Sequence, residues 1–310
     1  MKNSMNLIER HFLATLLIFS LIGLFFSKYI YWTSSMVHPM LSLIAFCVGL
    51  TLKPQNYKNV FYNKKLIFST LAFKYAIAPL FTFLICSLAK LPTEYIVGLV
   101  TLTCCPAANT GNIMCYLARG NTAMIITTTI TGALLSPLVT PIIIFILLHK
   151  IVHIQFSVVM LTIVSGIAIP MLVGMALAYF FPKKIDKLKP VIPSIGILSV
   201  SIIIAAILSQ HANTILTLNI GLPIICASLI TLFLSLGFLF SRLINSSWEN
   251  SVAMSFEVGT FDGVLGILLT IQIIGMTGTL PVVLFAVLNL IIGSIASKMF
   301  SSTNPMRISA

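Results

Sequence analysis

Long apolar stretches dominate this sequence and constrain its fold more than any other feature. Ten of them follow one another, and most exceed the ~18 residues that mark a bilayer-spanning helix. Their approximate ranges are 11–33, 37–52, 66–89, 94–118, 122–148, 156–181, 191–209, 215–241, 250–272 and 279–299. A transmembrane barrel would instead show alternating segments of about 10 residues. The pattern therefore predicts an all-α integral membrane protein with ten transmembrane helices.

The composition agrees with a bilayer as the main partner. The 310 residues are 58% hydrophobic and 8% charged, whereas a soluble chain carries about 25% charged residues. The net charge of +12 would suggest nucleic acid binding in a soluble protein. Here the cations lie in short loops between apolar segments, so no nucleic acid partner is expected, and no obligate protein partner is evident. The six cysteines lie within apolar segments without CxxC spacing, which favours a packing role.

The basic residues also predict the orientation in the membrane. If the N-terminus is cytoplasmic, almost all Lys and Arg of the loops fall on the cytoplasmic side, and only Lys90 and Lys150 fall on the other. Cytoplasmic loops are enriched in Lys and Arg. Both termini are therefore expected in the cytoplasm, which agrees with an even number of helices.

The best internal boundary lies near residues 149–155. It divides the chain into 1–150 and 151–310, with five apolar segments in each half. Because an odd number of helices reverses the direction of the chain, the halves would have opposite orientations. Two inverted five-helix repeats are typical of secondary transporters.

Two segments are interrupted in mid-membrane. Segment 94–118 contains TCCPAANTGN, and segment 250–272 contains FEVGTFDG. Each is the fourth segment of its half, and paired Gly/Pro interruptions at matching positions point to a transport site. The free amides of a broken helix suit an anionic substrate, and its free carbonyls suit a small cation. The alternative is a pair of simple kinks, because Gly and Pro are common in membrane helices.

Three charged residues lie well inside the apolar segments: Lys74, Glu257 and Asp262. A charge at this depth is costly, so it is expected to face the protein interior and to have a partner. We expect Lys74 to pair with Glu257 or Asp262, and the alternative is that it snorkels to the cytoplasmic interface. One positive and two negative charges leave one unbalanced negative charge, which one bound cation or one proton would neutralise.

With these motifs in place, the sequence resembles the bacterial branch of the bile acid:sodium symporter family over nearly its whole length. The similarity rests on LIAFCVGLTLKPQNYKNV, on CYLARGN after the first interruption, and on FEVGTFDG. It implies a transporter of the bacterial inner membrane, with a panel domain of segments 1, 2, 6 and 7 and a core domain of segments 3–5 and 8–10. The broken helices 4 and 9 would cross in the core. The substrates of the family are organic anions such as bile acids, sulfated steroids, pantoate or pyruvate.

The resemblance implies two sodium sites behind the crossing. Carried over to this sequence, the first would use Asn112, Thr129 and Glu257. The family has hydroxyl residues where Gly111 and Ile125 stand, so this chain lacks two side-chain ligands there.

The second site would use Glu257 and the carbonyls of Val258 and Thr260. The family commonly has Gln where Lys74 and Phe261 stand, and the position of Asp262 is commonly Asn. An ammonium group near Glu257 would take over the electrostatic role of Na⁺ and repel a second cation. We therefore predict that Lys74 replaces one of the two sodium ions.

The candidate substrate-binding residues are Asn109, Thr110 and Gly111 in the first interruption, and Asn289 in the last segment. The family tends to have a His-Asn pair where this chain has Asn289 and Leu290. A small carboxylate, similar to pantoate, is therefore favoured over a bile acid.

The predicted function is cation-coupled import of a small organic anion by alternating access. Ion coupling would involve Lys74, Glu257, Asp262 and the first-site residues, with Na⁺ as the possible coupling ion and no other cofactor. A proton-coupled or uncoupled facilitator and a channel-like protein are the alternatives. An enzyme would need a nucleophile–base pair or a metal cluster, and the sequence indicates neither.

Overall fold

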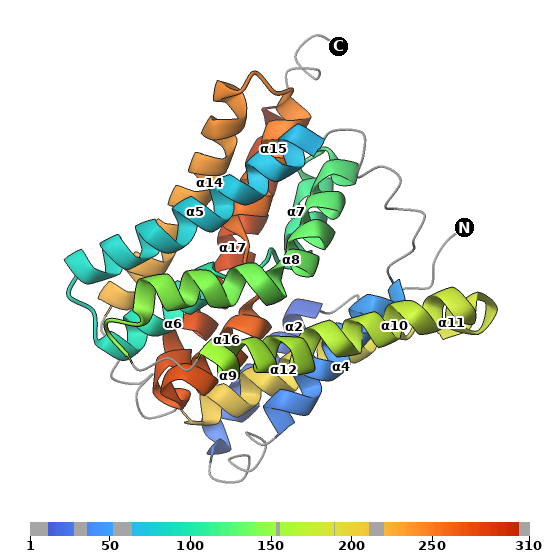
Figure 1. Ribbon diagram of the computed structural model, residues 1–310, viewed down its shortest axis with the longest axis horizontal. Coiled ribbons are helices and arrows are strands. Elements are labelled where there is room, and N and C mark those ends of the chain that lie inside the picture. Colours follow the sequence, from blue (N-terminus) through green and yellow to red (C-terminus); the bar gives the residue numbers. More distant parts are fainter. Residues whose placement is uncertain are drawn as a thin grey trace. The chain divides into compact units, whose positions relative to one another are not determined.

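The structure, a computed structural model, describes residues 12–27, 36–51, 64–152, 156–188, 190–210 and 220–303. Within these ranges every secondary-structure element is a helix (Figure 1). Six described spans are long and apolar enough to cross a membrane: Lys64–Leu88, Thr122–Leu148, Phe156–Phe180, Gly221–Leu243, Trp248–Ile274 and Met276–Ser302. The prediction of an all-α membrane protein is confirmed. The count of ten helices and the inverted repeat stay predictions.

One compact unit comprises Met1–Asn56 and Ser157–Leu218. Its elements are α2 (Phe12–Phe25), α4 (Val37–Thr51), α9 (Phe156–Ile163), η3 (Val164–Ala168), α10 (Ile169–Phe180), α11 (Pro182–Leu188) and α12 (Ile192–Gln210). Glycines allow close helix crossings here. A Cβ on Gly23 would lie 2.5 Å from the backbone oxygen of Ala205, and one on Gly49 would meet the backbone of Met171. Such small residues are typical of helix contacts in membranes.

The second compact unit comprises Tyr57–Phe156 and Asn219–Ala310. Its elements are α5 (Lys64–Leu88), α6 (Thr93–Thr103), α7 (Asn109–Leu117), α8 (Thr122–Leu148), α14 (Gly221–Leu243), α15 (Trp248–Gly259), α16 (Gly263–Ile274), η4 (Met276–Gly278) and α17 (Thr279–Ser302). Both predicted interruptions lie in this unit, between α6 and α7 and between α15 and α16.

The first interruption follows from Pro106. Proline has no backbone N–H, and it disfavours helical geometry at the residue before it. Accordingly α6 ends at Thr103, and α7 begins at Asn109 after an extended Ala108. The hydroxyl of Thr140 on α8 donates to the Cys104 carbonyl at 2.8 Å. A carbonyl that the interruption frees is thereby satisfied inside the protein, as membrane depth requires.

The second interruption runs from Gly259 to Gly263. Thr260 is extended, and its N–H and hydroxyl both donate to the Phe256 carbonyl, at 3.1 and 2.8 Å. Asp262 then begins α16 as its N-cap. The backbone N–H of Asp262 donates to the Pro106 carbonyl at 2.9 Å. This hydrogen bond joins the two interruptions, so the broken segments meet where their helices stop.

Candidate cation and substrate site

Lys74 lies on α5 and is fully buried. Its ammonium nitrogen donates to the backbone carbonyls of Glu257 and Thr260, both at 3.0 Å. The same nitrogen lies 4.7 Å from the centre of the Phe261 ring, within range of a cation–π interaction. The ammonium therefore sits at the negative C-terminal end of α15, where a cation is favoured. The alternative that Lys74 snorkels to the interface is wrong.

Of the two predicted partners of Lys74, Glu257 and Asp262, the ammonium bonds to Glu257, and it does so through the main-chain oxygen. Among the described residues, the hydrogen-bond acceptors of the ammonium are backbone oxygens. Sequence reasoning expected the carbonyls of Val258 and Thr260 to face a cation here. Thr260 does so, and the second oxygen comes from Glu257, one residue before Val258.

The carboxylate of Glu257 is buried, with 1% of the residue exposed, and is only half satisfied. Its Oε2 accepts a hydrogen bond from the Thr129 hydroxyl at 2.7 Å. The same hydroxyl lies 3.1 Å from Oδ1 of Asn112. One hydroxyl proton thus faces two acceptor oxygens. The three residues predicted as a sodium site are brought together, from α7, α8 and α15.

The other carboxylate oxygen, Glu257 Oε1, is buried and has no hydrogen-bond partner among the described residues. It lies 3.9 Å from the Cβ position that a side chain at Gly132 would have. The Tyr75 hydroxyl lies 3.6 Å from that position and donates to the Gly132 carbonyl at 3.2 Å. Sequence reasoning missed Tyr75 and Gly132, since their place beside Glu257 depends on the packing of α5 against α8.

A buried carboxylate with one hydrogen bond is an expensive group. Leaving an ionised group buried without compensation costs several kcal/mol. Glu257 thus has one orphaned oxygen, Oε1, while its other oxygen contacts the Thr129 hydroxyl, which also contacts Asn112 Oδ1. Oxygen ligands with a carboxylate among them fit a small hard cation such as Na⁺. At the C-terminal end of α15 the Lys74 ammonium donates to the carbonyls of Glu257 and Thr260, so these two oxygens already face a cation.

The side chains of Asp262 and Asn289 both form hydrogen bonds with the backbone at the second interruption. Oδ1 of Asp262 accepts from the amides of Val264 and Leu265, both at 3.1 Å, which caps the positive end of α16. The side-chain amide of Asn289, on α17, donates to the Gly259 carbonyl at 2.7 Å. Asn289 was predicted to bind substrate, and the contact observed here is with the backbone of α15.

The N-terminal end of α7 differs from that of α16. Its N-cap residue, Ala108, has no side chain that could accept from the helix amides. The first amides of any helix lack intrahelical partners, which makes an uncapped end a place for an anion. Here Asn109 is exposed, Thr110 and Asn112 are half-buried, and Gly111 is buried. The residues predicted to bind substrate at the first interruption, Asn109, Thr110 and Gly111, therefore form the first turn of α7.

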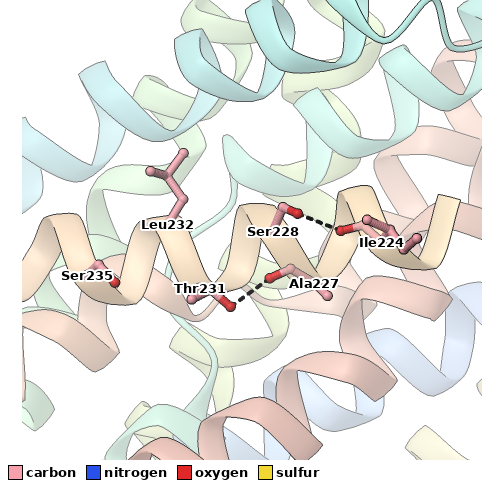
Figure 2. A pocket seen from close by; sticks show the side chains of 6 residues that line it. All are labelled: Ile224, Ala227, Ser228, Thr231, Leu232 and Ser235. Atoms are coloured by element: carbon pink, nitrogen blue, oxygen red, sulfur yellow. Dashed lines mark hydrogen bonds between the residues drawn. The ribbon is translucent and has the colours of Figure 1, made fainter. Parts of the chain in front are cut away.

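A separate shallow groove of about 550 Å³ runs along α14 (Figure 2). Its lining comprises Ile224, Ala227, Ser228, Thr231, Leu232 and Ser235. The hydroxyls of Ser228 and Thr231 donate to carbonyls of their own helix, at 2.8 and 2.9 Å. With these donors satisfied inside α14, the groove offers no ionic chemistry comparable to that at Glu257.

Comparison with known proteins agrees with the geometry. A model of the sodium bile acid symporter family matches residues 38–218, which is more than half of the chain. The chain belongs to this family. The match includes the first interruption and ends before the second.

Two relatives extend the similarity over most of the chain. A Bacillus subtilis protein named uncharacterized sodium-dependent transporter YocS is 26% identical over 287 residues, covering 92% of this chain and 89% of the relative. The Arabidopsis thaliana protein named probable sodium/metabolite cotransporter BASS1, chloroplastic, is 28% identical over 265 residues, or 84% of this chain and 65% of the relative.

Membership of this family has four direct consequences. The chain is a multi-pass membrane transporter, and it is not an enzyme. A small molecule is its substrate, and the lipid bilayer is its environment.

Proposed function

We propose that this protein is a secondary active transporter that imports a small organic anion together with one Na⁺ by alternating access. The two relatives named as sodium-dependent or sodium/metabolite transporters support sodium as the coupling ion. The observation that carries the proposal is the half-satisfied carboxylate of Glu257, buried beside Thr129 and Asn112. A cation bound there would neutralise Glu257 and reduce the cost of its burial.

In this proposal Lys74 replaces the second sodium ion. Its ammonium holds the Glu257 and Thr260 carbonyls at the C-terminal end of α15. The group is positively charged and fully buried, and its donor hydrogens point to oxygens that a metal ion would otherwise need. Asp262 contributes negative charge nearby while it caps α16.

The substrate anion binds at the N-terminal end of α7. The amides and side chains of Asn109 and Thr110 would receive a carboxylate next to Gly111, because this helix end has no side-chain cap. The Gly111 amide itself donates to the Ala108 carbonyl at 3.0 Å. Asn289 contributes by holding the Gly259 carbonyl, so that the second interruption keeps its place beside the first. A small carboxylate of the pantoate type fits such a site better than a bulky steroid.

For the architecture we retain ten transmembrane helices in two inverted repeats, 1–150 and 151–310. The panel would comprise segments 1, 2, 6 and 7, and the core segments 3–5 and 8–10. The compact units Met1–Asn56 with Ser157–Leu218, and Tyr57–Phe156 with Asn219–Ala310, support this division. The protein would lie in the bacterial inner membrane with both termini in the cytoplasm.

The test of this function combines binding and uptake. Thermal unfolding of the purified protein is measured with a panel of small carboxylates, each with Na⁺ or with choline, and a bound ligand should raise the melting temperature. The best carboxylate is then used for saturable uptake into proteoliposomes. Uptake should require Na⁺. Uptake that persists in choline and follows pH would indicate proton coupling, and uptake that never saturates would indicate a channel.

A pair of matched variants ties the result to the site. Thr129→Val removes the hydroxyl that contacts Glu257 and Asn112 and keeps the shape of the side chain. Thr131→Val removes a hydroxyl of the same helix that, in the described part of the chain, donates to the Thr127 carbonyl alone. The first variant should raise the Na⁺ concentration needed for half-maximal stabilisation about tenfold or more, equivalent to about 1.4 kcal/mol. The second should leave it unchanged, and equal effects would refute the assignment.

A further inference from the structure

Two kinds of charge matter at this site: the charges of side chains, which stay with the protein, and the charges of bound ions, which cross the membrane with the substrate. Lys74 is fixed, because its ammonium is buried and bonded to two carbonyls of the second interruption. Asp262 is also fixed in its role, since Oδ1 holds the N-terminal amides of α16. The charge of such a side chain influences which ions bind, but it is not itself transported across the membrane.

The carbonyls at the second cation position already have hydrogen-bond donors. Of the carbonyls where α15 ends, those of Glu257 and Thr260 accept from Lys74, and that of Gly259 accepts from Asn289. The Phe256 carbonyl accepts from the N–H and the hydroxyl of Thr260. A mobile cation would need the Glu257 and Thr260 oxygens and would therefore have to displace the Lys74 ammonium.

The carboxylate of Glu257 is different, because its Oε1 has no hydrogen-bond partner in the described part of the chain. It carries one negative charge and therefore calls for one monovalent cation. We propose that one mobile Na⁺ moves with one monovalent anion and that the transport cycle transfers no net charge. This proposal rests on the sodium-coupled transport proposed above.

This stoichiometry has two consequences. Substrates should be monovalent anions, because a divalent anion with one Na⁺ would move negative charge toward the negative side of the membrane. The accumulation should follow the sodium concentration gradient alone. A transporter with two Na⁺ per monovalent anion would gain about 50-fold in accumulation from 100 mV of potential, at about 2.3 kcal/mol per charge.

The first experiment counts sodium ions without the need for a substrate. Equilibrium binding of ²²Na⁺ to the purified full-length protein should give one ion per chain with a Hill coefficient of about 1. Lys74→Gln, which removes the fixed charge and supplies an amide oxygen, should give two ions per chain. Lys65→Gln alters an exposed lysine of the same helix and should still give one.

The outcomes separate this inference from the function on which it rests. Two ions bound to the unaltered protein, or one ion bound to Lys74→Gln, would overturn the inference and leave sodium-coupled transport intact. No ²²Na⁺ bound to the unaltered protein would overturn both.

The second experiment stays decisive if Lys74→Gln does not fold. Proteoliposomes are given an inward gradient of pantoate or pyruvate, and ²²Na⁺ entry is followed with the potential set by potassium and valinomycin. Entry of ²²Na⁺ that depends on the anion should be the same at 0 and −100 mV inside. Stimulation by the negative potential would overturn the electroneutral cycle, and so would the absence of any sodium entry with either monocarboxylate.

Discussion

Glu257 is the residue on which the proposed coupling depends, and its two carboxylate oxygens have different surroundings. Oε2 is held by the Thr129 hydroxyl, whereas Oε1 faces the backbone at Gly132 without a partner in the described structure. The Tyr75 hydroxyl lies near the same point but donates to the Gly132 carbonyl. The absence of a side chain at Gly132 leaves space beside this buried, unpartnered oxygen.

Gly132→Ala tests whether a cation uses the space beside this oxygen. The added methyl group would lie 3.1 Å from a Leu71 methyl, 3.6 Å from the Tyr75 hydroxyl and 3.9 Å from Glu257 Oε1. It would fit with small adjustments, yet it would cover the free oxygen. We expect the Na⁺ concentration for half-maximal thermal stabilisation to rise roughly tenfold, or about 1.4 kcal/mol. Gly196→Ala, whose methyl would meet nothing within 4 Å, is the control and should change nothing.

Two variants of Asp262 distinguish the role of its side chain as a helix cap from the role of its negative charge. Asp262→Ala removes the cap of α16 and should cost about 1 kcal/mol in stability. Asp262→Asn keeps an oxygen for the amides of Val264 and Leu265 and should cost little. Thermal unfolding in detergent compares the two variants. Equal destabilisation would mean that the charge of Asp262, and not its cap, stabilises the site.

At the scale of elements, the C-terminal end of α15 is held from two directions. α5 contributes Lys74 and α17 contributes Asn289, and each donates to a carbonyl near the second interruption. The interruption thus depends on tertiary contacts as well as on its glycines. Freed carbonyls at membrane depth have no water to replace these donors.

Asn289→Leu should therefore destabilise the interruption itself. Removing the amide leaves the buried Gly259 carbonyl without its donor, at a cost of about 1–3 kcal/mol. Ser294→Ala is the matched change on α17, at an exposed hydroxyl that bonds to its own helix, and should stay within about 0.5 kcal/mol. Thermal unfolding of both variants decides, and similar melting temperatures would contradict the role assigned to Asn289.

The sequence predicted the positions of both interruptions, because Pro106 and the glycines act locally on the backbone. It also predicted that Lys74 would be buried near Glu257 or Asp262, since a charge at membrane depth needs a partner. It could not predict that Lys74 would bond to main-chain oxygens, nor that Tyr75 would lie beside Glu257. Those contacts depend on the rotation and register of α5 against α8 and α15, which apolar periodicity leaves undetermined.

At the scale of the whole molecule, exposed basic residues are unevenly distributed in the second unit. The helix ends near Lys65, Arg119 and Lys298 carry exposed cations. The opposite ends of these helices carry exposed Lys90 and Lys150. With both termini in the cytoplasm, the first group would lie on the cytoplasmic side, as the enrichment of Lys and Arg there requires.

Cysteine labelling tests this orientation with little background. All six native cysteines are buried, so they should react slowly with a membrane-impermeant maleimide. Lys150→Cys, at an exposed position after α8, should be labelled in intact spheroplasts. Lys298→Cys, exposed near the end of α17, should be labelled only after the membrane is permeabilised. Since the two positions should lie on opposite sides, labelling of Lys298→Cys alone in intact spheroplasts would reverse the assigned orientation. Labelling of both on the same side would refute the predicted count of crossings between them.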